Sequence, residues 1–265
     1  MNTIRNGAFN SSEIVALIEM GSREMTSEEL VEYKKANPTS KAKTMKCPLM
    51  FSKGGQTFIK QTNQERKAKR SLDTNESSRA TTWGKLVERW LMYERPDIIG
   101  LEYTLTPNTT LAHPLHSNYW VGSRDGLNNK TKAVIDIKCP YTIGSFCNFA
   151  DCIDIEQVRE EHTDGEKYYW QLTSNACIGE TDKAELIVYI PNLEDLAAIQ
   201  QYAVKLYNDG EKECYFIANA SYEELPYLPK ESLYENKIVF QFDIPEHDLD
   251  FLTNRVILAA KNLIP

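Results

Sequence analysis

Apolar residues along the chain follow two periodicities, which separate predicted helices from predicted strands. A period of three to four residues, typical of a helix with one buried face, predicts helices at 11–18 (with a serine cap), 27–35, 82–94, 165–178, 193–207 and 246–262. Pro38 and Pro96 end the second and third of these helices. Short apolar runs bounded by turn residues predict strands at 98–105, 119–123, 133–138, 184–190, 212–218 and 237–243.

The order of these elements predicts an α/β fold with a small mixed central sheet flanked by helices. A turn cluster at 128–130 separates the strands at 119–123 and 133–138, so these two are expected to form a hairpin. Residues 37–80 are polar, basic and weakly periodic, which is typical of a long loop or a mobile insertion. We expect one domain over 1–265, with this basic insertion and a C-terminal strand and helix extension at about 208–265.

Composition excludes several classes of protein. The chain has 265 residues, of which 42% are hydrophobic, and no apolar stretch approaches the length that spans a bilayer. The N-terminus lacks the apolar core of a signal peptide, so a cytoplasmic protein with no membrane partner is expected. The six cysteines have neither zinc-finger nor iron–sulfur spacing, and reduced thiols are expected.

Charge is segregated along the chain. The net charge of −8 is unusual for a nucleic-acid binder, but residues 41–70 hold nine basic side chains against Glu65 alone. Residues 151–166 show the reverse, with seven acidic side chains against Arg159. This asymmetry permits a basic groove on an acidic body.

The candidate chemistry lies in Asp125 and in the triplet Asp136-Ile137-Lys138. Paired strands would bring the two carboxylates close together, where they repel each other unless a cation lies between them. Carboxylate oxygens suit Mg²⁺, for which Mn²⁺ commonly substitutes. Alternation along a strand places Asp136 and Lys138 on one face, with Ile137 buried on the other. A lysine beside a metal-bound water suits phosphodiester hydrolysis, although an ordinary surface ion pair would give the same pattern.

Four ordered stretches resemble the phage recombination exonucleases typified by lambda exonuclease, the YqaJ-like viral recombinase family of the PD-(D/E)XK nuclease superfamily. Residues 5–14 are similar to its opening Arg-x-Gly-x-x-x-x-Ser-Glu motif, and 83–88 to its Trp-Gly-Lys-x-x-Glu helix. Residues 123–127 with 136–142 are similar to Ser-Pro-Asp-Gly-Leu and Glu-Leu-Lys-Cys-Pro-Phe-Thr, and 168–172 to a Tyr-x-x-Gln-x-Gln helix. The last 75 or so residues match no motif of the family.

The resemblance implies a restriction-endonuclease-like core and a set of site residues. The implied metal ligands are Asp125, Asp136, the Ile137 carbonyl and Glu88, the last through water or a second ion. Lys138 would orient and activate the attacking water, and Gln171 would complete the catalytic set. The implied contacts to DNA and to a 5′-terminal phosphate are Arg5, Ser12, Ser123 and Lys85.

The chain departs from the family pattern at several positions. Asp136 stands where close relatives have Glu, and Thr173 stands at the second Gln of the helix motif. The acidic residue expected about ten positions before Asp125 is absent, which questions a second metal site, although His116 lies nearby in sequence. A longer gap between Ser12 and Gly84 holds the basic segment. The tryptophans and tyrosines of the helix motifs are expected in the core rather than as base-stacking platforms.

The implied function is a Mg²⁺-dependent 5′→3′ exonuclease that degrades one strand of double-stranded DNA from its ends for phage-type recombination. The family also implies a homo-oligomer (a trimer), a single-strand annealing protein as partner, and a phage or prophage origin in a bacterial host. A PD-(D/E)XK endonuclease and a weakly active DNA-end-binding accessory protein remain alternatives.

Overall fold

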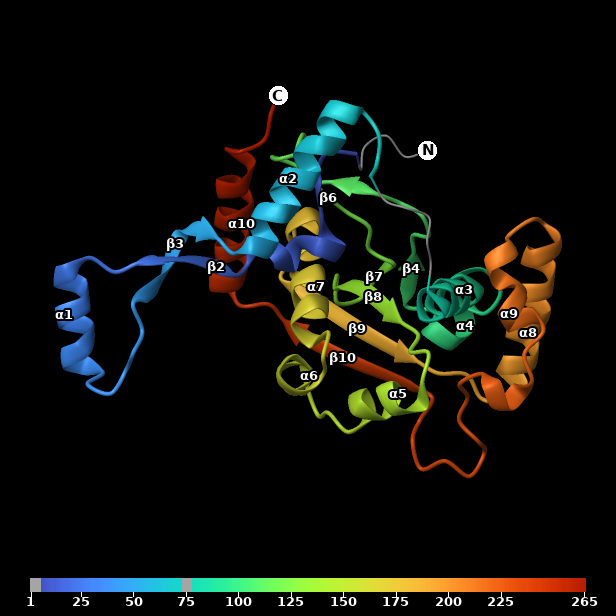
Figure 1. The fold of residues 1–265 in the computed structure, drawn as a ribbon. Helices are drawn as coiled ribbons and strands as arrows, with labels where there is room; N and C mark the ends of the chain where they lie inside the picture. Colours follow the sequence, from blue (N-terminus) through green and yellow to red (C-terminus); the bar gives the residue numbers. More distant parts are fainter. Residues whose placement is uncertain (1–5, 73–77) are drawn as a thin grey trace.

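A five-stranded mixed sheet lies at the centre of the computed structural model, which describes residues 6–72 and 78–265 (Figure 1). The strand order is β10 (Lys237–Asp243), β9 (Lys183–Tyr189), β8 (Val134–Lys138), β7 (Gly126–Asn128) and β4 (Tyr103–Leu105). β8 and β9 are parallel, and the other neighbours are antiparallel. The predicted α/β class with a small mixed sheet is therefore confirmed.

Each face of the central sheet carries its own hydrophobic core, because side chains alternate along the strands. Val134 and Leu186 face the first core, whereas Ile135 and Ile187 face the second. The first core is formed with α5 (Ile143–Ala150), α6 (Ile155–Glu161), α7 (Gly165–Gly179) and α10 (Glu246–Ala260). The second is formed with α3 (Arg79–Tyr93), α4 (Pro96–Ile99), α8 (Leu193–Asn208), η3 (Lys212–Cys214) and α9 (Tyr215–Ala218), followed by η4 (Tyr222–Glu224).

A small second sheet joins residues 9–10 near the start of the chain to residues 111–122. Its order is β1 (Phe9–Asn10), β6 (Trp120–Gly122) and β5 (Leu111–Ala112), with β1 parallel to β6. The 3-10 helix η2 (Ser11–Leu17) follows β1, and its cap is Asn10, whose side chain accepts a hydrogen bond from the Glu13 amide. The cap is therefore Asn10 and not the predicted serine.

The predicted loop at 37–80 is wrong for most of its length. β3 (Thr44–Phe51) pairs with β2 (Met20–Glu24), and the two strands carry α1 (Ser27–Ala36) away from the body as an arm (Figure 1). The 16-residue helix α2 (Lys53–Ala68) then packs against the first core through Phe58 and Ile59. Its apolar face is short and the rest is polar, so the sequence pattern gave little sign of a helix.

Three further predictions need correction. Residues 98–105 form the end of α4 and then β4, because Gly100 has a φ of 137° and interrupts the extended run. The hairpin joins β7 to β8, whereas β6 belongs to the second sheet. Residues 212–218 are helical, with Cys214 and Ile217 buried at helical spacing. No helix in the described ranges is long and apolar enough to cross a membrane.

Candidate active site at the end of strand β8

The strand β8 presents Asp136 and Lys138 on the face that packs against α7. Asp136 is 1% exposed, and its Oδ2 lies 2.5 Å from Lys138 Nζ. Ile137 points to the opposite core and is likewise 1% exposed. The alternation expected from the sequence is therefore present, and it joins the buried carboxylate to a cation rather than leaving both in solvent.

Asp125 approaches the same end of β8 from the neighbouring chain segment. It lies directly before β7, and its amide donates to the Ile135 carbonyl at 3.0 Å. Its Oδ2 accepts a hydrogen bond of 2.6 Å from the Ile137 amide. The carboxylate thereby takes the place of a backbone partner where the two strands diverge, which fixes it beside Asp136.

Glu88 reaches this group from α3, on the other side of the sheet. Its pKa is raised to about 7, chiefly by burial, with Lys138 opposing the rise and the Asp136 charge adding to it. Burial also raises the pKa of Asp125 well above its ordinary value, reinforced by the charges of Glu88 and Asp136. For Lys138, burial alone would lower the pKa, but the surrounding carboxylates outweigh burial and raise it. Three acids and one lysine thus act on one another electrostatically.

Gln171 and Tyr168 complete the surroundings of Lys138 and Asp136 from α7. Gln171 Nε2 donates to Asp136 Oδ1 at 2.7 Å, and Gln171 is buried. The Tyr168 ring centre lies 5.1 Å from Lys138 Nζ. Tyr168, expected in the core, packs partly buried against the first core and also lines the site. Its spacing of three residues before Gln171, on the same side of a helix, was the signal that could have identified it.

A cavity of about 370 Å³ adjoins this group of residues. Its walls come from α3, the end of β8, α5 and the start of α7. Lys85, Glu88, Lys138, Tyr141 and Tyr168 are among the residues that line it. Cys139, directly after β8, is buried in the second core. Glu88 and Lys138 therefore face this cleft directly, whereas Asp125, Asp136 and Gln171 are not among its lining residues.

The chemistry of the donor set fits a hard divalent cation. Neighbouring negative charges help to raise the pKa of Glu88 and of Asp125, and a cation placed among such carboxylates stabilises them. Across 6–72 and 78–265, however, no three His, Cys, Asp or Glu side chains are placed to hold an ion by themselves. Asp125 and Asp136 would therefore share the ion with the Ile137 carbonyl and with oxygens from water or substrate. Glu88 would approach the ion from α3, through a bound water or a second ion.

The residues expected around a 5′-phosphate are only partly brought together. The register of β1 on β6 pairs Asn10 with Val121 and so directs the segments beginning at Ser11 and Gly122 to one edge. Ser12 Oγ donates to Asn10 Oδ1 at 2.7 Å, and Ser123 Oγ lies 3.0 Å from Thr110 Oγ1. Arg5 lies outside the described residues. Lys85 is exposed and lines the cleft over the carboxylates.

His116 belongs to an aromatic cluster. Its ring stacks on His113 at 4.8 Å between centroids, and its Nδ1 lies 2.9 Å from the Tyr119 hydroxyl. These contacts hold His116 in the segment between β5 and β6. The expected core positions of Trp83, Trp90, Tyr169 and Trp170 are confirmed, since each is at most 4% exposed.

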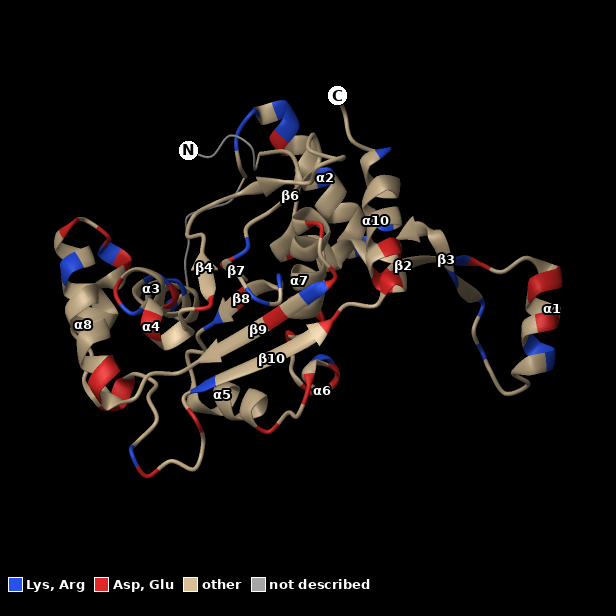
Figure 2. Ribbon diagram, turned by 180° about the vertical axis from the view of Figure 1, so that it is seen from behind, with Lys and Arg blue, Asp and Glu red and all other residues tan. Residues whose placement is uncertain are grey.

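The basic segment 41–70 is divided between two elements. Its first lysines lie on or before β3 in the arm, and the remainder lies on or just after α2. Arg66 is structural, because its guanidinium donates to the carbonyls of Gly7, Asn118 and Ile264. Lys67, Lys69 and Arg70 are exposed at the end of α2 or just after it. The ribbon there carries the colour of basic residues (Figure 2). The segment is therefore two separate basic regions rather than one continuous loop.

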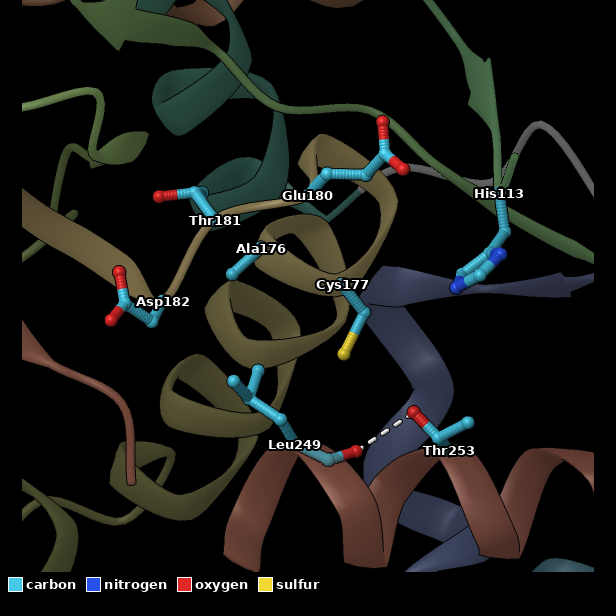
Figure 3. A pocket seen from close by; sticks show the side chains of 8 residues that line it. All are labelled: His113, Ala176, Cys177, Glu180, Thr181, Asp182, Leu249 and Thr253. Atoms are coloured by element: carbon cyan, nitrogen blue, oxygen red, sulfur yellow. Dashed lines mark hydrogen bonds between the residues drawn. The ribbon is translucent and has the colours of Figure 1, made fainter. Parts of the chain in front are cut away.

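A separate cavity of about 490 Å³ lies between the end of α7 and α10 (Figure 3). His113, Cys177, Glu180 and Thr253 line it, and Thr253 Oγ1 donates to the Leu249 carbonyl at 2.8 Å. Burial raises the pKa of Cys177 to about 11, so the thiol stays protonated near neutral pH and is a poor nucleophile. The cavity shares no residue with the carboxylate group, and we assign it no catalytic role.

Comparison with solved structures finds the same fold in exonucleases. The alkaline exonuclease LHK-Exo from Laribacter hongkongensis is 12% identical, with a TM-score of 0.54 over 97% of this chain and 89% of that chain. LHK-Exo in complex with dAMP gives 12% identity and 0.53 over 98% and 90%. A phage-related exonuclease from Haemophilus somnus 129PT gives 13% and 0.54 over 99% and 96%. No family model matches the sequence, and no curated protein does.

Proposed function

We propose that this protein is a divalent-metal-dependent DNA nuclease that hydrolyses one strand of double-stranded DNA from its ends, in the 5′→3′ direction. The observation that carries the proposal is the grouping of Asp125, Asp136 and Glu88 with Lys138 and Gln171 at the end of β8. The exonuclease fold supports it. The solved structure with dAMP supports the product class, because hydrolysis at a DNA end releases deoxynucleoside monophosphates.

Each residue has a distinct part in the proposed hydrolysis. Asp125 and Asp136, with the Ile137 carbonyl, would hold Mg²⁺ or Mn²⁺, and Glu88 would position water near it. When bound, the ion supplies an acidified water and stabilises charge on phosphorus. Lys138 is held as an ammonium by its ion pair with Asp136, so it donates hydrogen bonds to the attacking oxygen and to a phosphate oxygen. Gln171 keeps the Asp136 carboxylate in orientation.

The proposal extends to the DNA end. Ser12, Ser123 and Arg5 are proposed to recognise a 5′-terminal phosphate, because hydroxyls and a guanidinium suit a phosphate dianion. Lys85, exposed above the carboxylates, is proposed to contact the DNA backbone. A role in phage-type recombination with a single-strand annealing protein, a homo-oligomeric ring and a cytoplasmic site in a bacterial host are proposed from the family resemblance.

Incubation with linear and closed circular duplex DNA in Mg²⁺ or Mn²⁺ tests the proposal. The protein should degrade only the linear form, and faster when the end carries a 5′-phosphate. Lys138→Ala should abolish hydrolysis while the fold, measured by circular dichroism, is kept. Cleavage of the closed circle would show an endonuclease instead, and binding of DNA ends without cleavage of either form would show an accessory protein.

The 5′-phosphate site has its own test. Ser123→Ala and Arg5→Ala should each reduce the ratio of rates on phosphorylated and unphosphorylated ends. Ser40→Ala, a substitution remote from the cleft on the linker after α1, serves as the matched control and should leave that ratio unchanged. A preserved ratio in both site variants would contradict this part of the proposal and leave the nuclease assignment standing.

A further inference from the structure

The part of the chain with no recognised motif contributes an aromatic side chain to the neighbourhood of the cleft. Phe216, on the short helix α9, lies with its ring centre 6.2 Å from that of Tyr141 and at 90° to it. Tyr141 is a wall of the cleft over the carboxylates, three residues after Lys138. The C-terminal region is thus joined to the candidate active site through one ring–ring contact.

Arg79 joins the same group from the start of α3. Its Cζ lies 5.3 Å from the centre of the Phe216 ring, and its side chain is exposed. The next two residues, Ala80 and Thr81, line the cleft. An arginine, a tyrosine and a phenylalanine from three segments far apart in sequence therefore meet beside the cleft, and all three retain solvent exposure.

Buried residues of the second core support this group. Tyr141 rests on the fully buried Trp83, with 6.2 Å between ring centres, and Trp83 Nε1 donates to the Pro140 carbonyl at 3.1 Å. Phe216 is flanked by Cys214 and Ile217, which are both buried in the second core. The rings are positioned before any ligand arrives, which reduces the entropy that binding would cost.

The composition of the group matches unpaired nucleotides. An aromatic ring stacks on a nucleobase whatever its identity, and a neighbouring arginine binds the phosphate or stacks in turn. Inside duplex DNA both faces of each base are covered by their neighbours, so an internal base can stack on such a ring only when it is unpaired. Thr81, Lys85 and Glu88 lie on the cleft side of α3, and the helix rise places Arg79 roughly 14 Å from Glu88 along its axis. A single strand that runs from the carboxylates to Arg79 would therefore span a few nucleotides.

We propose that Tyr141, Phe216 and Arg79 form a binding site for single-stranded DNA beside the cleft, where at least one unpaired base stacks on an aromatic ring. The inference rests on the proposed function for its biological setting, because a nuclease that works from DNA ends must handle unpaired nucleotides. The site itself is independent of catalysis. It gives the C-terminal extension a role in positioning substrate.

Binding of two labelled oligonucleotides by the full chain, in EDTA so that no hydrolysis takes place, tests the proposal. One is a short oligothymidylate, and the other has the same backbone without bases. The protein should bind oligothymidylate more tightly than the abasic strand. Phe216→Leu and Tyr141→Leu should each weaken oligothymidylate binding by about tenfold, the loss of one stacked base, and leave abasic binding unchanged. Arg79→Gln should reduce the salt dependence of binding by about one phosphate contact.

Conservative and matched variants separate stacking from packing. Tyr141→Phe and Phe216→Trp retain a ring and should restore the affinity for oligothymidylate. Tyr215→Leu removes an exposed ring from the same short helix, one that packs on Tyr207 instead, and should change neither affinity. Thermal unfolding of every variant reports any loss of stability.

The outcomes separate this inference from the proposed function. Equal binding of the two oligonucleotides by the wild-type protein would overturn it, as would leucine variants that retain oligothymidylate affinity or lose abasic affinity to the same extent. If those results appear while the wild-type protein degrades linear DNA, the nuclease stands without the stacking site. If the wild-type protein discriminates base from abasic strand but cleaves nothing, the stacking site stands and the nuclease assignment fails.

Discussion

Gln171 on α7 donates a 2.7 Å hydrogen bond to Asp136, a carboxylate that is 1% exposed at the end of β8. Lys138 lies against the other oxygen of the same carboxylate. The two oxygens of Asp136 are therefore contacted by side chains from two different elements, so the carboxylate group cannot rotate freely. A carboxylate constrained in this way is preorganised for a ligand that needs a fixed geometry.

Gln171→Leu should lower the rate of DNA hydrolysis by about 10- to 100-fold, the usual cost of removing a partner that orients a metal ligand. The matched control is Tyr103→Phe, because the Tyr103 hydroxyl donates at 2.7 Å to Glu185, another buried carboxylate of the central sheet. Rates at saturating Mg²⁺ measure the effect. If Tyr103→Phe loses as much activity as Gln171→Leu, the effect is one of general stability and the orienting role is refuted.

Asp125→Asn and Asp136→Asn should each weaken Mn²⁺ binding by at least about tenfold, because each removes a negative charge next to the ion. Lys138→Ala should retain binding, since it removes a cation. Isothermal titration calorimetry with Mn²⁺ measures the affinities, with Asp243→Asn at the exposed end of β10 as a control. Unchanged affinity in both aspartate variants would place the metal elsewhere.

The stability of the protein should fall as the pH drops from about 6.5 towards about 4, in part because of His113. Burial and the charge of His116 lower the pKa of His113 to about 4, and its Nδ1 accepts a hydrogen bond from the Leu115 amide. Above about 6.5 the ring is neutral in both states and contributes nothing. Below that value the unfolded chain takes up the proton first, so unfolding is favoured.

Urea unfolding at several pH values measures this effect. Between about pH 6.5 and about pH 4, the free energy of unfolding of His113→Phe should fall less than that of the wild-type protein, by on the order of 1 to 2 kcal/mol allowing for solvent screening. His247→Gln, which changes a mostly exposed histidine, should leave the slope as it is. A His113→Phe protein with the wild-type pH profile would exclude His113 as the source.

Gly122→Ala should destabilise the protein by about 1 to 3 kcal/mol, the usual cost of overpacking a core. A Cβ at Gly122 would lie 2.3 Å from both Asn175 Oδ1 and Ser11 Oγ. Gly144→Ala on α5 is the matched control, because its Cβ would meet nothing within 4 Å and alanine favours a helix. The midpoint of thermal unfolding should therefore fall for Gly122→Ala and rise for Gly144→Ala. Equal shifts would show that the close approach at Gly122 is relieved at little cost.

Much of the central architecture could be predicted from the sequence. β8, β9, β10, α3, α7 and α10 follow from local periodicity, because each buries a continuous apolar run or stripe. The arm and α2 could not be predicted in this way. β3 is mostly exposed and is held by backbone pairing with β2, and α2 buries few side chains, so neither leaves a strong apolar pattern.

The candidate site likewise combines relations that local periodicity predicts with contacts that it does not predict. That Asp136 and Lys138 share one face of a strand, and that Tyr168 and Gln171 lie one helical turn apart, follows from the residue order alone, because these relations depend only on the pitch of each element. The contact of Gln171 with Asp136, the approach of Glu88 on α3 to the same end of β8, and the meeting of Phe216 with Tyr141 and Arg79 depend on how the elements pack. Such contacts join residues far apart in the chain, and they arise from how two cores pack on opposite faces of one sheet.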